Sequence, residues 1–334
     1  MKKIINDPQS FVDEMLEGIL AAHPRHLRAA SPDNRAVVRA DAPIKGQVGI
    51  VTGGGSGHLP VFLGYVGEGL CSGVAIGNVF SSPSAAQVLA ATRESDGGAG
   101  VLYLYGNYGG DVFSFDDAAE LAEDEGITVR TVLVADDVAS APADRREDRR
   151  GVAGLALAFK VAGAAAAEGA TLDEVADAVE HLNANMGSMG VGLSPTVLPA
   201  AGEPTFTLDE GEMEIGIGIH GERGVRRGPL DPADSIADEL FDTIFADLAL
   251  VDGDGVAVLV NGLGATPLEE LYLVFRRVSQ RCASAGITLE KPYVGEYATS
   301  LEMAGASITI VRLDDRLRRL LGAPASSPFM GAML

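Results

Sequence analysis

Several residue types are scarce in this chain of 334 residues, and each shortage excludes a class of protein. There are only two cysteines, Cys71 and Cys282, which lie far apart and lack the spacing of a metal site. A disulfide framework is therefore excluded, and a reduced, cytoplasmic setting is expected. We also expect that the chain itself binds no metal ion. Tryptophan is absent and glycine and alanine are abundant, which is typical of an α/β protein with closely packed elements and many tight loops.

Basic residues are also few, and this limits the partners that the chain can bind. Lysine and arginine number 25 against 47 aspartates and glutamates, so the formal net charge is -22. Such a surface repels phosphate backbones and anionic lipids, so neither a nucleic acid nor a membrane is expected as a partner. The longest apolar run, residues 151–169, contains Lys160 and predicts a buried helix rather than a membrane span. Residues 1–8 lack the apolar core of a signal peptide.

The chain is long enough for two domains, and its first half alternates short apolar runs with helical patterns. Residues 48–51, 101–104 and 129–134 each predict a buried strand, with helices over 84–92 and 116–125 between them. This alternation indicates an α/β domain with a mostly parallel sheet flanked by helices. An amphipathic helix behind a Ser10 cap is expected to open the chain, since Phe11, Met15, Leu16, Ile19 and Leu20 recur at helical spacing.

The second half is expected to form a separate, smaller α+β domain of two layers. A capping box at residues 171–174 begins a helix that runs to about Leu182. The glycine-rich stretch 186–195 reads as irregular, so we place the boundary there, with domains 1–185 and 186–334. Further along, strands are predicted over 212–219, 256–260 and 307–311, and helices over 235–248 and 267–285.

A glycine run follows the first buried strand directly, as Thr52-Gly53-Gly54-Gly55-Ser56-Gly57-His58. Ligands in α/β folds bind at the carboxyl ends of parallel strands, where small residues expose backbone N–H groups. The run is no P-loop, because the closing Gly-Lys-Ser/Thr is missing, and its spacing does not fit a dinucleotide fingerprint. By itself it predicts either a ligand loop or a plain tight turn.

Two further segments carry polar side chains to the same region. Gly106-Asn107-Tyr108-Gly109-Gly110-Asp111 follows the next strand and delivers the Asp111 carboxylate, which could equally be a turn or helix-cap residue. In Gly216-Ile217-Gly218-Ile219-His220-Gly221-Glu222, one histidine ends an apolar, glycine-studded run. Imidazole serves as nucleophile or proton carrier near neutral pH. His220 alone could be structural, but His58, Asp111 and His220 together could supply a base, an acid and a nucleophile.

Together with further motifs, these residues show that the chain resembles the dihydroxyacetone kinase substrate-binding subunit from end to end. The matching segments are Gly53-Gly54-Gly55-Ser56-Gly57-His58, Val79-Phe80-Ser81-Ser82-Pro83-Ser84, Gly106-Asn107-Tyr108-Gly109-Gly110-Asp111, Asp136-Asp137-Val138-Ala139, Arg149-Arg150-Gly151-Val152-Ala153-Gly154, Met189-Gly190-Val191-Gly192-Leu193-Ser194-Pro195, Gly218-Ile219-His220-Gly221-Glu222, Asn261-Gly262-Leu263-Gly264-Ala265-Thr266-Pro267 and Thr299-Ser300-Leu301-Glu302-Met303-Ala304-Gly305.

The resemblance implies a mechanism for the three polar side chains. The residue matching His220 adds through a ring nitrogen to the ketone carbon of a short-chain ketose and forms a covalent hemiaminal. His58 would assist as acid or hydrogen-bond donor to the alkoxide. Asp111 would orient the terminal hydroxyl and act as its base during phosphoryl transfer. The expected substrate-binding residues lie in the two glycine-rich loops and are Gly55, Ser56, Gly57 and Gly106.

The resemblance also implies a partner, because no nucleotide motif is present in this chain. ATP or ADP with magnesium is expected on a second, helical nucleotide-binding kinase subunit (DhaL-like), and this chain should bind no cofactor itself. A homodimer is expected on the same ground. The chain would then be a phosphotransferase, a ketose kinase that requires its partner.

Two positions depart from the family's usual dihydroxyacetone pattern. Leu59 stands where a glutamate is usual, and Gly106 where a lysine is usual. Without the lysine, a charged hydrogen-bond donor is missing and space is freed beside the ketose, so a larger ketose such as erythrulose could replace dihydroxyacetone. Alternatively, another residue supplies the missing contact to the ketose, and the substrate is still dihydroxyacetone. A ketose-sensing transcriptional co-regulator without phosphoryl transfer is the alternative function, against which His220 and Asp111 argue. A hydrolase with Ser56 as nucleophile lacks the spacing of a nucleophile elbow.

Overall fold

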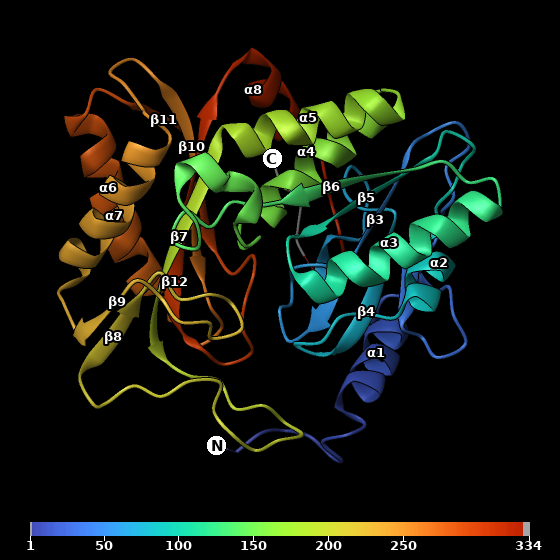
Figure 1. Ribbon diagram of the computed structural model, residues 1–334, viewed down its shortest axis with the longest axis horizontal. Coiled ribbons are helices and arrows are strands. Elements are labelled where there is room, and N and C mark those ends of the chain that lie inside the picture. Colours follow the sequence, from blue (N-terminus) through green and yellow to red (C-terminus); the bar gives the residue numbers. More distant parts are fainter. Residues whose placement is uncertain (1, 330–334) are drawn as a thin grey trace.

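The computed structural model describes residues 2–329 and contains two six-stranded sheets (Figure 1). The strands of the first sheet, in spatial order, are β1 (Leu27–Ala29), β2 (Ala36–Arg39), β4 (Gly73–Val79), β3 (Gly49–Ser56), β5 (Val101–Gly106) and β6 (Val129–Val134). Strands β4, β3, β5 and β6 are parallel, whereas β1 and β2 are antiparallel additions at one edge. The mostly parallel first sheet predicted from the sequence is therefore confirmed.

The second sheet is mixed and mostly antiparallel. Its strands, in spatial order, are β11 (Thr288–Gly295), β10 (Gly255–Gly262), β12 (Ala304–Leu313), β7 (Met186–Ser194), β8 (Glu212–Ile215) and β9 (Arg226–Pro229). Only β10 and β11 run parallel to each other. An α+β second half is consistent with this arrangement, and the first strand of the second sheet begins at Met186. The division into 1–185 and 186–334 stays a prediction.

Helices cover both sheets and also fill the space between them (Figure 1). They are α1 (Phe11–Ala22), α2 (Ala85–Arg93), α3 (Gly109–Asp124), α4 (Leu155–Ala167), α5 (Leu172–Ala184), α6 (Ala233–Asp247), α7 (Leu268–Ser284) and α8 (Asp315–Gly322), with short 3-10 segments η1 (Leu63–Tyr65) and η2 (Ala143–Asp148). Helices α2 and α3 pack on the outer face of the first sheet, and α6 and α7 on the outer face of the second. Helices α4 and α5 share the central core with residues of both sheets and of α8.

This central position explains the apolar run that the sequence contains. Helix α4 is buried almost throughout its length because it lies between the sheets, as the predicted buried helix requires. The Lys160 amine within it donates a hydrogen bond to the Ala323 carbonyl just after α8. Among residues 2–329, no helix is both long and apolar enough to cross a bilayer.

The sequence predicts the starts of helices α1, α3 and α5, and the structure agrees with these predictions only in part. The Thr171 hydroxyl accepts a hydrogen bond from the Glu174 backbone, and the Glu174 side chain bonds back, so the predicted capping box is confirmed. Ser10 precedes α1, but its side chain makes no capping hydrogen bond. Helix α3 begins at Gly109, seven residues before the expected start at 116, and Asp111 therefore lies in its first turn.

Two predictions for the second half are wrong, both because of glycine. The stretch 186–195 is expected to be irregular, but residues Met186–Ser194 form the inner strand β7, where Gly192 leaves room for the Ile217 side chain to pack on the strand. The strand predicted over 212–219 ends at Ile215, since Gly216 adopts a φ of 78° that turns the chain into a loop. His220 is therefore in a loop and not in a strand.

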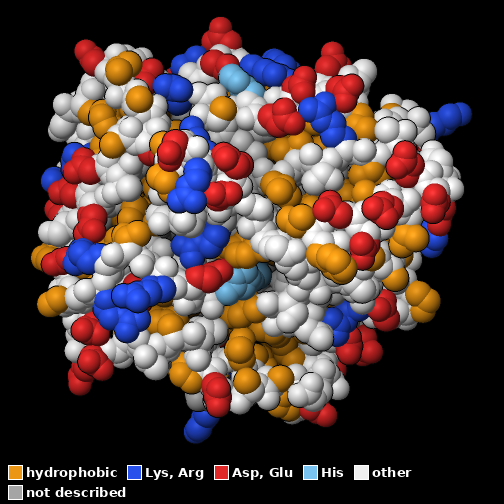
Figure 2. Space-filling view, viewed as in Figure 1, with side chains coloured by type: hydrophobic (Ala, Val, Ile, Leu, Met, Phe, Trp, Pro, Cys, Tyr) orange, Lys and Arg blue, Asp and Glu red, His pale blue; other side chains and the backbone are white. Residues whose placement is uncertain are grey.

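The acidic surface is interrupted by cations. Figure 2 shows arginine and lysine side chains interspersed among acidic ones over the face it presents. Many of these basic side chains form ion pairs with acidic neighbours; Arg130, for example, pairs with three carboxylates. No single-sign patch dominates this face, and the surplus acidity is distributed over it.

Candidate active site

Four loops bring four rings together where the two halves of the chain meet. Three of these loops follow the carboxyl ends of β3, β4 and β5, the edge at which parallel sheets bind ligands. They carry His58, Phe80 and Tyr108, whose ring centroids lie 4.8, 5.3 and 4.8 Å from that of His220. All three meet the His220 ring edge to face. The loop after β8 thus inserts His220 into an aromatic enclosure built by the first sheet.

The orientation of the His220 ring is set by Glu222. The Glu222 carboxylate accepts hydrogen bonds from the His220 backbone N–H and from Nδ1 of its ring, both at 2.9 Å. Burial alone would raise the pKa of Glu222, but the hydrogen bond from His220 lowers it to about 2. A carboxylate only accepts, so in the neutral imidazole Nδ1 carries the proton and Nε2 carries a lone pair. The free lone pair makes Nε2 the nucleophilic atom of the ring.

His58 is held as a neutral imidazole against Phe80. The two rings stack with centroids 4.7 Å apart, and the His58 side chain is 1% exposed. Its Nδ1 lies 2.8 Å from the Thr299 carbonyl and must donate to it, which leaves a lone pair on Nε2. Burial and the neighbouring His220 lower the pKa of His58 to about 3. In this state His58 Nε2 accepts a hydrogen bond, whereas the family resemblance implies a role as acid or donor.

Asp111 is a stronger base than an ordinary aspartate. It lies in the first turn of α3 and is 7% exposed. Burial raises the pKa of Asp111 to about 6, although a hydrogen bond from Ser82 opposes the rise. Three buried polar atoms lack a hydrogen-bond partner among the described residues of this region: Asp111 Oδ1, His58 Nε2 and the Tyr108 hydroxyl. Unpartnered buried polar atoms are costly, so this set favours a polar ligand.

The glycines at the end of β3 allow the chain to pack closely against Phe80. An added Cβ at Gly55 would lie 2.7 Å from the Ser81 nitrogen and 2.8 Å from the Phe80 Cα. At Gly57, where φ is 100°, it would lie 2.8 Å from the Phe80 ring. These glycines therefore let Phe80 approach closely enough to stack on His58.

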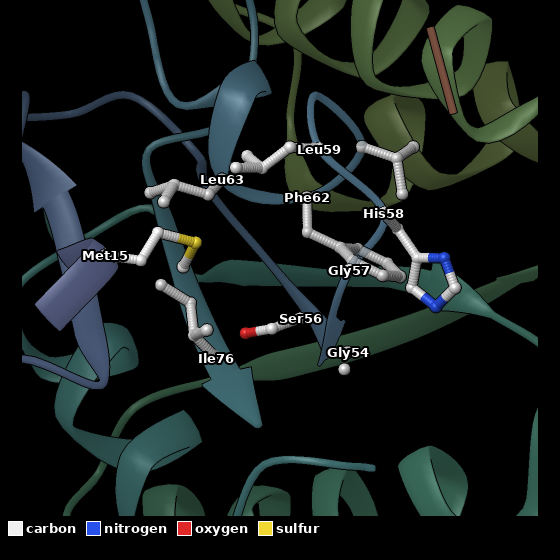
Figure 3. Close-up of a pocket in the computed structure, with 11 residues that line it drawn as sticks. Met15, Gly54, Ser56, Gly57, His58, Leu59, Phe62, Leu63 and Ile76 are labelled. Atoms are coloured by element: carbon white, nitrogen blue, oxygen red, sulfur yellow. The ribbon is translucent and has the colours of Figure 1, made fainter. Parts of the chain in front are cut away.

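Ser56 and Leu59 face a different space. The Ser56 hydroxyl donates to the Gly77 carbonyl at 2.9 Å. Figure 3 shows its side chain directed toward Met15 and Ile76, away from the His58 ring. Leu59 packs against the central core and lines the same small apolar pocket. Of the expected substrate-binding residues, Ser56 thus has its hydroxyl turned away from the His58 ring and bonded to the Gly77 carbonyl.

Gly106 lies behind Tyr108, at the end of β5. A Cβ built there would meet the Gly151 carbonyl, the Leu155 side chain and the Tyr108 ring at 3.3 to 3.4 Å. The absence of the lysine that the family resemblance implies therefore leaves no void beside the backbone at this position. Any space gained lies farther out, where the longer part of a lysine side chain would run.

The structure adds residues whose roles the sequence did not reveal. Phe80, Tyr108 and Glu222 contact His58 or His220 directly, and Ser82 hydrogen-bonds to Asp111. All four stand inside motifs that carry the family resemblance, but only the spacing of Glu222, two residues after His220, signals a local contact. Within residues 2–329, no group of three or more His, Cys, Asp or Glu residues is arranged to hold a metal ion.

Known proteins are similar to this chain along nearly its whole length. The chain is 46% identical over 329 residues to the dihydroxyacetone-binding subunit DhaK of PTS-dependent dihydroxyacetone kinase 2 from Listeria innocua, covering 98% of this chain and 99% of that protein. It is also 46% identical over 332 residues to L-erythrulose 1-kinase from Mycolicibacterium smegmatis, with 98% of this chain and 58% of that enzyme covered. The chain thus spans little more than half the length of that enzyme.

A solved structure has the same fold. The dihydroxyacetone kinase operon co-activator DhaQ superposes with a TM-score of 0.88 at 33% identity, covering 95% of this chain and 97% of that one. The two-part α/β fold expected from the motifs, and the family of phosphotransferases to which they point, are confirmed. The sequence model of the Dak1 domain family matches residues 17–329, so the chain belongs to the Dak1 family.

Proposed function

We propose that this chain is the ketose-binding subunit of a dihydroxyacetone-type kinase and that His220 binds its substrate covalently. The observation that carries the proposal is the hydrogen bond from His220 Nδ1 to Glu222, which leaves Nε2 unprotonated inside a ring of aromatic side chains. Only a carbonyl carbon can accept this nitrogen, so the reaction discriminates ketoses from polyols such as glycerol.

The addition balances without any further reactant. The Nε2 lone pair forms a bond to the ketone carbon, the carbonyl π bond breaks, and its oxygen becomes an alkoxide that takes a proton from solvent water, which regains one when Nδ1 is deprotonated. The imidazole becomes positively charged, and the Glu222 carboxylate beside Nδ1 stabilises that charge or takes the proton. A charge that develops next to a fixed carboxylate is stabilised in the transition state as well.

Asp111 and His58 then act on the hydroxyls of the bound ketose. With a pKa raised to about 6, Asp111 is ionised at neutral pH and still basic enough to take the proton of the terminal hydroxyl during phosphoryl transfer. The unpartnered Nε2 of His58 accepts a hydrogen bond from a second hydroxyl. Gly55, Gly57 and Gly106 contribute backbone groups and close packing around this position.

The phosphoryl group must come from a partner. We propose that ATP or ADP with magnesium is bound by a helical nucleotide-binding subunit, and that this chain, as a homodimer, presents the ketose to it. The name of the Listeria relative describes the dihydroxyacetone-binding subunit of a PTS-dependent dihydroxyacetone kinase, which supports a division of labour between chains.

The ketose is either dihydroxyacetone or a larger one such as erythrulose. Gly106 in place of the family's usual lysine, and the similarity to L-erythrulose 1-kinase, support the larger substrate. The buried Tyr108 hydroxyl without a partner offers one further hydrogen bond near His220 for an additional hydroxyl group. A ketose with four carbons would use this group, whereas dihydroxyacetone would not need it.

A panel of ligands tests both parts of the proposal. Wild type and His220→Ala are incubated with dihydroxyacetone, both erythrulose enantiomers and glycerol, and native mass spectra are recorded. We expect wild type to gain the full mass of a ketose without loss of water, and His220→Ala and all glycerol samples to gain nothing. If no ketose gave an adduct dependent on His220, the covalent mechanism would be refuted. Gly106→Lys should shift the preferred ketose toward dihydroxyacetone.

A ketose-sensing co-regulator is the second candidate, and the structural similarity to the DhaQ co-activator supports it. Such a protein needs to bind a ketose but does not need a base for phosphoryl transfer. The basicity of the buried Asp111 is therefore the property that separates the two functions. Turnover of a ketose by the chain with a purified helical kinase subunit would favour the kinase, and ketose binding without turnover would favour the regulator.

A further inference from the structure

Behind His220, an ion pair fills the space above a glycine. Arg150 Nη1 lies 4.0 Å from Glu222 Oε2, and the two groups meet over Gly218. A Cβ at Gly218 would overlap the Glu222 carboxylate and lie 2.6 Å from the Arg150 guanidinium. The place of a side chain at Gly218 is thus taken by the ion pair.

Arg150 is itself firmly anchored. Its Nε and Nη2 lie 2.9 and 2.7 Å from Asp137 Oδ2, and its Nη2 also donates to the Gly216 carbonyl at 3.1 Å. The Asp137 side chain is 3% exposed and that of Arg150 is 16% exposed. Arg150 therefore connects Asp137, in the first half of the chain, to both ends of the loop that carries His220.

Glu222 depends on this anchor. Its side chain is 33% exposed, and within residues 2–329 Arg150 is the one lysine or arginine paired with it. A half-exposed carboxylate without a fixed cation can rotate into solvent and leave the imidazole. The ring nitrogen that carries the proton is set by the hydrogen bond that the other one makes, so loss of Glu222 would let the proton move to Nε2.

We propose that Arg150 is a positioning residue for the ketose addition: it holds Glu222 over Gly218 so that His220 keeps its proton on Nδ1 and its lone pair on Nε2. This inference rests on the proposed function, because it assumes that Nε2 of His220 is the atom that adds to the ketone. Arg150 touches neither the ketose nor the nucleophilic atom, and it acts only through Glu222. Gly218 is required because any side chain there would separate the ion pair.

Two variants and a matched control test the role of Arg150. Arg150→Met removes the cation, and Gly218→Ala keeps every charged group but displaces the carboxylate. Arg146→Met is the control, since Arg146 also joins the first half to the second through Asp247 but lies in another ion pair. The ring nitrogens of His220 are followed by NMR in protein with labelled histidine, assigned with His220→Ala, and ketose adduct formation is measured on the same samples.

We expect Arg150→Met and Gly218→Ala to move the proton of His220 toward Nε2 and to weaken the adduct about 10- to 100-fold, the scale seen when the hydrogen-bond partner of a metal-bound histidine is lost. Glu222→Gln should weaken the adduct at least as much, and Arg146→Met should leave both readouts at wild-type values. Retention of the Nδ1 proton and of wild-type adduct affinity in Gly218→Ala would overturn the inference, even if Arg150→Met fails to fold. If wild type forms no adduct, the proposed function fails, and the proton position in the variants still decides the role of Arg150.

Discussion

Asp111→Asn should stabilise the protein at neutral pH while it abolishes phosphoryl transfer. Folding buries the Asp111 carboxyl and raises its pKa from 3.8 to about 6, so the folded protein holds the proton more tightly than the unfolded chain does. The carboxyl therefore stabilises the folded state fully below the unfolded pKa. This contribution is lost as the pH rises through the folded pKa of about 6.

The size of the effect follows from the shift. One pKa unit corresponds to about 1.4 kcal/mol, so the ionised carboxylate costs the folded state about 3 kcal/mol at neutral pH relative to acid. Asparagine has nearly the same shape and does not ionise. The stability of Asp111→Asn relative to wild type should accordingly increase by about 2 to 3 kcal/mol between about pH 4 and about pH 7.

Urea unfolding of both proteins across this pH range measures the effect. Asp117→Asn, an exposed change on the same helix, is the control and should show no such trend. A difference between Asp111→Asn and wild type that stays constant with pH would refute the assignment of Asp111 as a buried, basic carboxylate. In the kinase assay, Asp111→Asn should be inactive although it still forms the ketose adduct.

Three further predictions concern the surroundings of the site. Because burial lowers the pKa of His58 to about 3, its ring-proton resonances should not titrate between about pH 5 and about pH 8, and a midpoint near 6.5 in NMR would contradict this. Gly55→Ala forces its Cβ against the Phe80 backbone and should lose about 1–3 kcal/mol in urea unfolding, whereas wild-type stability would show that the loop can yield. Asp247→Ala leaves the buried Arg149 without its carboxylate and should cost about 3–5 kcal/mol; a loss much smaller than this would mean that water reaches the guanidinium.

Much of the site is predictable from the sequence because polar residues after parallel strands converge at one edge. The positions of His58 and Asp111 follow from that rule, and His220 stands out by its glycine-rich setting. Glycine is an ambiguous signal, because it is abundant both in loops and in closely packed strands. For this reason the sequence predicts an irregular segment where β7 forms, and a strand before His220 that is longer than the observed β8.

Contacts between distant segments are what the sequence does not reveal. The proton position on His58 depends on the Thr299 carbonyl, 241 residues away along the chain. Arg150 reaches the loop of His220 across the boundary between the two halves, so nothing near either residue in the sequence signals the pair. The burial that makes Asp111 basic likewise arises only when the loops of β4 and β5 pack together.

The covalent role of His220 is the central claim, and one NMR measurement tests it directly. The protein is prepared with isotope-labelled histidine and mixed with a ketose labelled at its carbonyl carbon. We expect the ketone resonance to be replaced by that of a saturated carbon with one-bond coupling to Nε2 of His220, and this signal should be absent in His220→Ala. A bound ketose that keeps its ketone resonance, with no coupling to a ring nitrogen, would contradict the account.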